Sequence, residues 1–152
     1  MIEDKLRELS IDLPTPPSPA GSYIPVVTTG NLAFVSGQIP MKEGKVVFEG
    51  KVPNEQSLDA ARDAAKICII NGLAQLKANL GSLDKITKFV RISGFVNSSP
   101  NFTEQPKVIN AASDLLVEIF GDIAKHSRIA VGVTSLPLNS TVEIDMVVEF
   151  ST

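Results

Sequence analysis

Only two long stretches of this chain repeat their apolar residues at the three- and four-residue spacing of a helix. Around them lie six shorter segments that are rich in β-forming residues or alternate apolar and polar side chains. Two helices are too few to cover both faces of a six-stranded sheet. We therefore expect an α+β fold of two layers, in which a six-stranded mixed sheet carries both helices on one face.

Capping residues mark the ends of the two expected helices. Asn54 is a good N-cap for the first helix, and Gly81 is placed to end it in the left-handed conformation that glycine adopts easily. The second helix is expected to begin near Thr103 and to tolerate Pro106 in its first turn. Gly121 is placed to end this second helix.

The last predicted strand alternates most regularly, with apolar residues on one face and acidic residues on the other. Val147 breaks this alternation, and residues 127–133 also hold apolar side chains in both phases. The second face of the sheet is therefore expected to be buried as well, which predicts an oligomer. The six predicted strands are residues 23–29, 32–36, 45–48, 86–96, 127–135 and 142–150.

The N-terminal part of the chain differs from the rest. Residues 1–10 can form one or two helical turns, whereas residues 13–19 contain four prolines and can form neither a helix nor a central strand. We expect residues 1–19 to be an N-terminal extension with a proline-rich arm, and residues 20–152 to form a single domain.

Composition excludes several classes of function. With 14 Lys and Arg against 17 Asp and Glu, the net charge of −3 disfavours nucleic-acid binding. A single cysteine, Cys68, excludes an internal disulfide, and a single histidine, His126, excludes a multi-histidine metal centre. No apolar run is long enough to span a membrane, and no signal peptide is recognisable, so we expect a cytoplasmic protein.

No phosphate loop, dinucleotide fingerprint, zinc signature or nucleophile elbow is present, so no cofactor or metal is expected. Three pieces of sequence carry more information: Gly21-Ser22-Tyr23, Ser36-Gly37-Gln38-Ile39-Pro40, and the segment 127–133 with Leu136-Pro137 and 142–145 after it. In this order and spacing they resemble the RidA/YjgF family of reactive-intermediate deaminases, whose members are also labelled L-PSP endoribonucleases or translation inhibitors. The resemblance covers about residues 20–150.

This resemblance implies a chorismate-mutase-like fold that assembles as a homotrimer around a barrel-like centre. It also implies active sites in clefts between subunits, which work without a cofactor. The implied reaction is the hydrolysis of 2-imino and enamine acids, such as 2-aminoacrylate, to 2-oxo acids and ammonia.

Arg128 and Glu143 are the catalytic residues that the resemblance implies. The guanidinium of Arg128 can bind a substrate carboxylate through paired donors and remains charged at any relevant pH. Glu143 can activate water or assist proton transfer to the leaving amine. From the residues alone, an Arg in a strand such as Arg128 more often pairs with a carboxylate across the sheet, and Glu143 could equally be a solvated strand residue.

Four further residues match substrate-binding positions of the family: Tyr23, Gly37, Asn110 and Ala130. Tyr23 can close the cleft, Gly37 permits close approach of the backbone, and Asn110 lies on the second helix. Ala130 stands where many members have cysteine, which removes any thiol role. Tyr23, Gly37 and Asn110 also have plain structural interpretations: a packing residue for Tyr23, a turn for Gly37, and an exposed helix position or an interface hydrogen bond for Asn110.

Two other functions stay open at this stage. The change at Ala130 fits a protein that binds a small carboxylate metabolite without converting it. The family labels also include ribonuclease. The excess of acidic over basic residues and the lone His126 argue against RNA cleavage.

Overall fold

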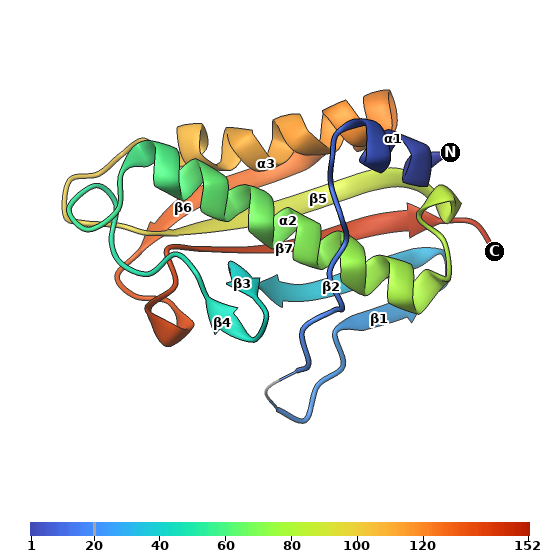
Figure 1. Cartoon of the computed structure of the whole chain (residues 1–152), viewed down its shortest axis with the longest axis horizontal. Helices are drawn as coiled ribbons and strands as arrows, with labels where there is room; N and C mark the ends of the chain where they lie inside the picture. The colour runs from blue at the N-terminus through green and yellow to red at the C-terminus, as the bar shows by residue number, and fades with distance from the viewer. Residues whose placement is uncertain (20) are drawn as a thin grey trace.

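A five-stranded sheet with the order β1-β2-β7-β5-β6 forms one layer of the structure (Figure 1). Neighbouring strands are antiparallel except β5 and β6, which run parallel. The structure is a computed structural model that describes residues 1–19 and 21–152, so the predicted domain boundary at residue 20 lies outside the described residues. The strands of this sheet are β1 (Val26–Thr29), β2 (Leu32–Gln38), β5 (Ile86–Asn97), β6 (Ser127–Val133) and β7 (Val142–Phe150).

The two-layer α+β class is confirmed, but the prediction of six strands in one sheet is wrong. The segment predicted at 45–48 contributes only β4 (Lys45–Val46), which pairs with β3 (Met41–Lys42) in a separate two-stranded ribbon. Glu43 and Gly44 join them with positive φ angles of 53° and 78°. This tight turn closes the hairpin locally, so the segment never reaches the edge of the main sheet.

Both long helices pack on one face of the sheet, as predicted, and lie side by side (Figure 1). The prediction that Asn54 caps the first helix is wrong, because the helix begins after Ser57, whose hydroxyl accepts a hydrogen bond from the Ala60 backbone N–H at 3.0 Å. Gly81 ends this helix with a left-handed φ of 88°, as predicted. The helices are α1 (Ile2–Glu8), α2 (Leu58–Leu80) and α3 (Gln105–Phe120), with short 3₁₀ turns η1 (Leu83–Lys85), η2 (Gly121–Ala124) and η3 (Pro137–Asn139).

Small residues let the helices lie close to the sheet. Three alanines of α2 are fully buried, and a Cβ on Gly94 of β5 would overlap the side chain of Ile109 on α3. A Cβ on Gly72 of α2 would likewise overlap Met146 of β7. The sequence therefore sets the distance between the two layers through these small side chains.

An aromatic pair, Phe89 and Phe120, lies in the core between the layers. Phe89 of β5 is fully buried, and its ring packs edge to face on that of Phe120 with 4.8 Å between the ring centroids. Cys68 of α2 is also fully buried, as predicted, and its Sγ lies 3.6 Å from the backbone carbonyl oxygen of Val142. Burial raises the pKa of this thiol well above its ordinary value.

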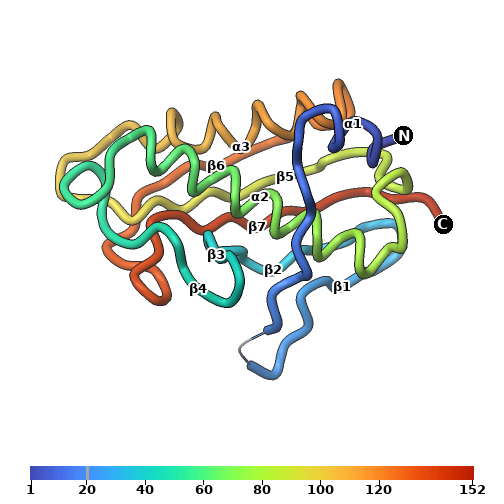
Figure 2. The backbone as a smooth tube through the Cα atoms, in the orientation of Figure 1, coloured from blue at the N-terminus to red at the C-terminus, as the bar shows by residue number. Residues whose placement is uncertain are grey.

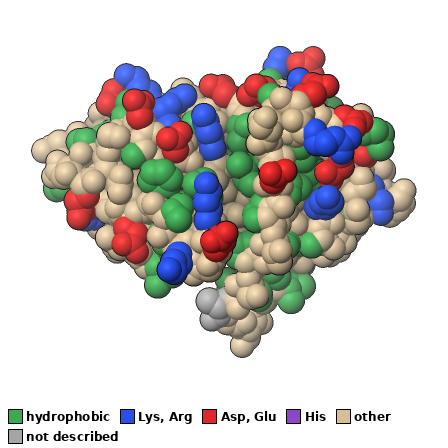
Figure 3. All heavy atoms as spheres, viewed as in Figure 1, with side chains coloured by type: hydrophobic (Ala, Val, Ile, Leu, Met, Phe, Trp, Pro, Cys, Tyr) green, Lys and Arg blue, Asp and Glu red, His purple; other side chains and the backbone are tan. Residues whose placement is uncertain are grey.

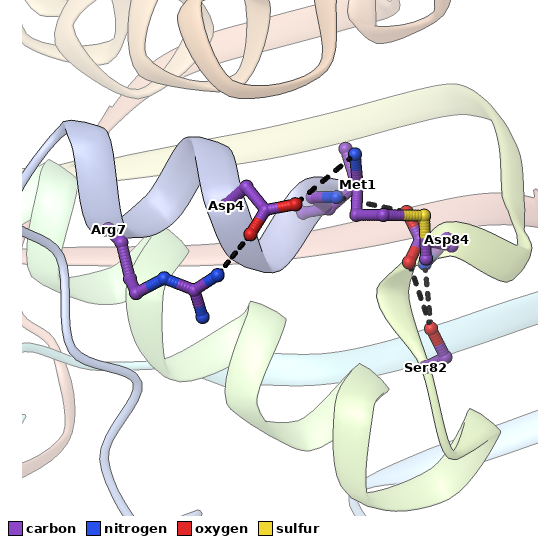
Figure 4. A network of polar contacts seen from close by, with 6 residues as sticks. Met1, Asp4, Arg7, Ser82 and Asp84 are labelled. Carbon is purple, nitrogen blue, oxygen red and sulfur yellow. Dashed lines mark hydrogen bonds and ion pairs between the residues drawn. The ribbon is translucent and has the colours of Figure 1, made fainter.

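The N-terminal segment is attached to the helical layer. The predicted short helix forms as α1, and its Leu6 is buried in the core. The backbone N–H of Ile2 donates to Asp84 Oδ1 at 2.9 Å, while Asp4 pairs with Arg7 and with the terminal amine (Figure 4). None of the described helices is long and apolar enough to cross a membrane.

The proline-rich arm crosses α2 after leaving α1 (Figure 2). Gln75 of α2, which is almost fully buried, donates from Nε2 to the carbonyl oxygen of Pro17 at 2.8 Å. Because an amide donor from the helix holds the arm at this point, residues 17–19 form a wall beside the end of β2.

The sheet face opposite the helices carries exposed apolar side chains. Phe34 of β2 is 43% exposed, and Val131 of β6 is 41% exposed. Phe34 pairs with Val147 of β7, the residue that breaks the alternation of that strand. Val147 and the apolar residues of 127–133 are the reason why burial of this face in an oligomer is predicted, and Phe34 adds an exposed apolar side chain to the same face.

Candidate functional site

The six residues predicted for the site fall into two separate groups in a single chain. Arg128 pairs in register with Ile92 of β5, whose side chain is buried beneath the helices. Glu143 of β7 pairs with Phe95 of β5, which lies three residues after Ile92 and therefore points to the other face of the sheet. Arg128 and Glu143 therefore point to opposite faces of the sheet, and β5 lies between their strands.

Arg128 is held by the side of α3 that faces β6. Its Nη1 donates to Asn110 Oδ1 at 2.9 Å and to Ser113 Oγ at 3.1 Å. Asn110 and Ser113 are three residues apart, which places both on the same side of the helix. The structure thus brings Arg128 and Asn110 within hydrogen-bonding distance of each other.

The charge of Arg128 has no counter-ion within the described part of the chain. No ion pair to a carboxylate forms there, so the alternative of a cross-sheet salt bridge is not what the structure has. Its Nε and Nη2 donors make no hydrogen bond to the described residues. A half-buried guanidinium with one edge fixed and the other edge available is suited to bind a small anion.

A histidine lies behind this guanidinium. His126 Nε2 is 2.9 Å from Ser113 Oγ, and its Nδ1 is 2.6 Å from the carbonyl oxygen of Ala124. Burial lowers the pKa of His126, the positive charge of Arg128 lowers it further, and the Ala124 carbonyl acts in the opposite direction. Sequence reasoning missed Ser113, since nothing in its local sequence marks a residue that meets His126 only through packing of α3 on β6.

Ala130 lies two residues beyond Arg128 on the edge strand β6, in register with Gly94. Its side chain is half-buried against the core and offers no polar atom. Any contact that Ala130 makes to a polar ligand must therefore come from its backbone.

The second group lines a cavity of about 410 Å³ at the end of β2. Tyr23, Gly37 and Glu143 all face this cavity, together with the arm residues 17–19 and the η3 residues Pro137 and Leu138. Most of its wall is apolar, and Glu143 is the one carboxyl group among the lining residues that the structure describes. The cavity therefore combines an apolar surface with a single acidic group.

Gly37 is needed here for the close approach of a side chain. A Cβ at this position would overlap the Glu143 carboxylate oxygen Oε2. The sequence interpretation expected Gly37 to leave room for a ligand, whereas in the single chain it leaves room for Glu143. Any larger residue at position 37 would displace the carboxylate from its place in the cavity.

Burial raises the pKa of Glu143, and the neighbouring charge of Asp145 raises it further. A carboxyl group with a raised pKa can exchange protons closer to neutral pH. Among the residues that the structure describes, no group of three His, Cys, Asp or Glu side chains is placed to hold a metal ion.

The raised pKa of Glu143 predicts a pH-dependent effect of Glu143→Gln on stability. Below the ordinary pKa of 4.5, Glu143 is protonated and therefore neutral, like the glutamine that replaces it. The wild type and the Glu143→Gln variant should then unfold at similar temperatures. As pH rises through the folded-state pKa, the wild type must bury a charge and loses stability that the glutamine variant keeps. Thermal unfolding should therefore show similar unfolding temperatures for the variant and the wild type at pH 4, and a higher unfolding temperature for the variant at pH 8.

Glu118→Gln is the matched control for this prediction, because Glu118 is exposed on α3. An equal difference between Glu143→Gln and wild type at both pH values would contradict the raised pKa.

Comparisons with known proteins extend over nearly the whole chain. A family model described as "YjgF/chorismate_mutase-like, putative endoribonuclease" matches residues 3–150. The chain is 39% identical over 147 residues to Protein TCP17 of Trypanosoma cruzi, which covers 96% of this chain and 92% of that protein. It is 32% identical over 138 residues to a 2-iminobutanoate/2-iminopropanoate deaminase of Dermatophagoides farinae, and this alignment covers 91% of this chain and 93% of that protein.

The fold matches solved structures equally well. The crystal structure of Atu1372 from Agrobacterium tumefaciens, described as a protein of unknown function, superposes with a TM-score of 0.93 at 44% identity. That alignment covers 99% of this chain and 92% of the solved one. Similarity on this scale includes α1 and the arm as well as the sheet and the two long helices.

Proposed function

Because the chain belongs to the YjgF/chorismate-mutase-like family, we propose that it hydrolyses 2-imino and enamine acids to 2-oxo acids and ammonia. The observation that carries this proposal is the guanidinium of Arg128, which is fixed along one edge by Asn110 and Ser113 and has no counter-ion in the described chain. A relative that is 32% identical and named as an imine deaminase supports the same reaction.

The chemistry begins with binding of the substrate carboxylate by the Nε and Nη2 donors of Arg128. An enamine acid first becomes the imine, because its terminal carbon gains a proton and its nitrogen loses one. Water then adds to the carbon of the C=N bond, and the nitrogen takes up a proton. The hydroxyl of the resulting tetrahedral carbon then gives up its proton to the nitrogen, the C–N bond breaks and the C=O bond forms, so one imine and one water give one 2-oxo acid and one ammonia. Glu143, with its raised pKa, is suited to accept the water proton and to deliver it to nitrogen.

Arg128 and Glu143 cannot meet one substrate within a single chain, because they face opposite sides of the sheet. We therefore place the site between copies, where the β6 edge of one protomer meets the cavity at the end of β2 in the next. A head-to-tail contact gives a closed ring only when its rotation divides a full turn, and we propose a closed ring of three members, the number that the family resemblance implies. The exposed apolar side chains of the open sheet face support such an assembly, since they are left in water in a single chain.

The proposed trimer predicts a specific effect of charge on the open face. Replacing Phe34 or Val131 by aspartate should lower the mass measured by sedimentation from that of three chains to that of one. Assembly would bury the new carboxylate between chains with no opposite charge to pair with it, which is unfavourable. Ile123→Asp on η2 is the control, since Ile123 is 37% exposed but lies off the sheet. A wild type that sediments as a single chain at micromolar concentration would contradict the trimer.

The reaction itself is tested by adding the protein to a dehydratase that releases 2-aminoacrylate. We expect faster formation of both the 2-oxo acid and ammonia than in the absence of the protein. No acceleration, combined with calorimetric binding of 2-oxobutyrate, would instead indicate a protein that binds a carboxylate metabolite without turnover.

A third arm of the experiment measures cleavage of RNA, because the matching family model carries an endoribonuclease label. On the face seen in Figure 3, basic and acidic side chains are interspersed rather than gathered into a basic stripe. This pattern and the net charge of −3 favour the deaminase. RNA cleavage without imine hydrolysis would overturn the proposal.

A further inference from the structure

The hydrogen bonds behind Arg128 have a defined direction, which starts from a backbone carbonyl. The oxygen of Ala124 can only accept a hydrogen bond, and it lies 2.6 Å from His126 Nδ1. Nδ1 must therefore carry the proton in this contact. When the imidazole is neutral, its other nitrogen, Nε2, has no hydrogen and can only accept.

The bare Nε2 determines how the hydroxyl of Ser113 points. Ser113 Oγ lies 2.9 Å from Nε2, so the hydroxyl hydrogen must be donated to the ring. The lone pairs of Oγ are then left for other donors, and Arg128 Nη1 donates to Oγ at 3.1 Å. The result is a chain of donors that runs from Arg128 through Ser113 and His126 to the carbonyl of Ala124.

Two features of the surroundings favour the neutral ring that this chain requires. His126 and Ser113 are both half-buried, and desolvation lowers the pKa of the imidazole. The nearby positive charge of Arg128 acts in the same direction. A doubly protonated ring would make Ser113 Oγ accept from two cations at once.

We propose that Ser113 and His126 are positioning residues that fix the guanidinium of Arg128 in the orientation that binds an anion. Ser113 and Asn110 together hold Nη1, so the Nε and Nη2 edge stays turned away from α3 and available to a carboxylate. His126 acts only through Ser113 and does not touch the substrate. The identity of the substrate rests on the proposed function, whereas the positioning of Arg128 rests on these contacts alone.

The first test measures the tautomer directly. The chain contains one histidine, so a protein labelled with ¹⁵N-histidine gives one assignable pair of ring nitrogen signals. At pH 7.5 we expect Nδ1 to be protonated and Nε2 to be bare, and we expect Ser113→Ala to shift the Nε2 signal. A proton on Nε2 in the wild type would overturn the inference, whatever the protein does to imines.

The second test measures 2-oxobutyrate binding by calorimetry and imine hydrolysis by ammonia release. Ser113→Ala and His126→Ala should each weaken binding and raise KM about 5- to 10-fold, with kcat within about twofold of wild type, because the carboxylate is held equally in the ground state and the transition state. Ser113→Thr keeps a hydroxyl and His126→Gln keeps an acceptor, so both should bind within about twofold of wild type. Thermal unfolding shows whether each variant is folded.

The outcomes separate this inference from the proposed function. Folded Ser113→Ala and His126→Ala variants that bind as tightly as wild type would overturn the positioning role. Loss of binding in these variants and in Arg128→Ala, without any ammonia release by the wild type, would support the positioning role and reject the deaminase. Binding that does not depend on Arg128 would reject the anion site on which both are built.

Discussion

Replacement of Arg128 by alanine is expected to lower kcat/KM for 2-imino acids by about 10²- to 10⁴-fold. The variant loses two hydrogen bonds from a charged donor to the substrate carboxylate, each with a contribution of about 1.5–3 kcal/mol. Since about 1.4 kcal/mol corresponds to a factor of ten, their sum gives this range. Initial rates of ammonia release at several substrate concentrations provide the measurement.

Arg128→Lys separates charge from geometry in the same assay. Lysine keeps the positive charge but offers a point donor instead of a planar pair, so only part of the activity should return. Arg7→Ala is the matched control, because the Arg7 side chain is 71% exposed and, among the described residues, pairs with Asp4 on α1 alone. Equal activity of Arg128→Ala and Arg7→Ala would show that the guanidinium on β6 takes no part in the reaction.

Phe89→Ala is expected to destabilise the folded protein by about 3–5 kcal/mol, the largest effect that a single core substitution should have here. Phe89 is fully buried, packs edge to face on Phe120, and sits where β5 is covered by the helical layer. Its removal leaves a cavity that the surrounding strands and helices cannot fill. Urea unfolding followed by circular dichroism gives the difference in free energy.

Phe89→Leu provides the comparison for this prediction, since it retains most of the apolar volume and should cost less than about 1.5 kcal/mol. A loss below 1 kcal/mol in Phe89→Ala would indicate that the core relaxes around the missing ring. Such a result would contradict the tight spacing of the layers that Gly94 and Gly72 impose.

Much of the fold follows from periodicity and from glycine. The helical spacing predicted α2 and α3, and Gly81 and Gly121 end them because both adopt positive φ. The start of α2 was misplaced because Asn54 and Ser57 are both acceptable caps, and only the folded turn shows which hydroxyl or amide meets a free backbone N–H. Short-range turn geometry at Gly44, rather than strand propensity, kept the 45–48 segment out of the sheet.

The candidate site was predicted in part. The resemblance selected Arg128 and Asn110, and the structure brings them within hydrogen-bonding distance. Alternation alone placed Glu143 on the face opposite the core residues of β7. The contact of Ser113 with His126 could not be foreseen, because it depends on how α3 rotates over β6, which no local pattern specifies.

The position of Cys68 provides a built-in probe of unfolding. This thiol is fully buried and is the single cysteine of the chain, so an added alkylating reagent can reach it only when the layers separate. The rate of modification would then report the opening equilibrium in native buffer without denaturant or an engineered label. For Phe89→Ala, faster alkylation would measure the same loss of stability by an independent route.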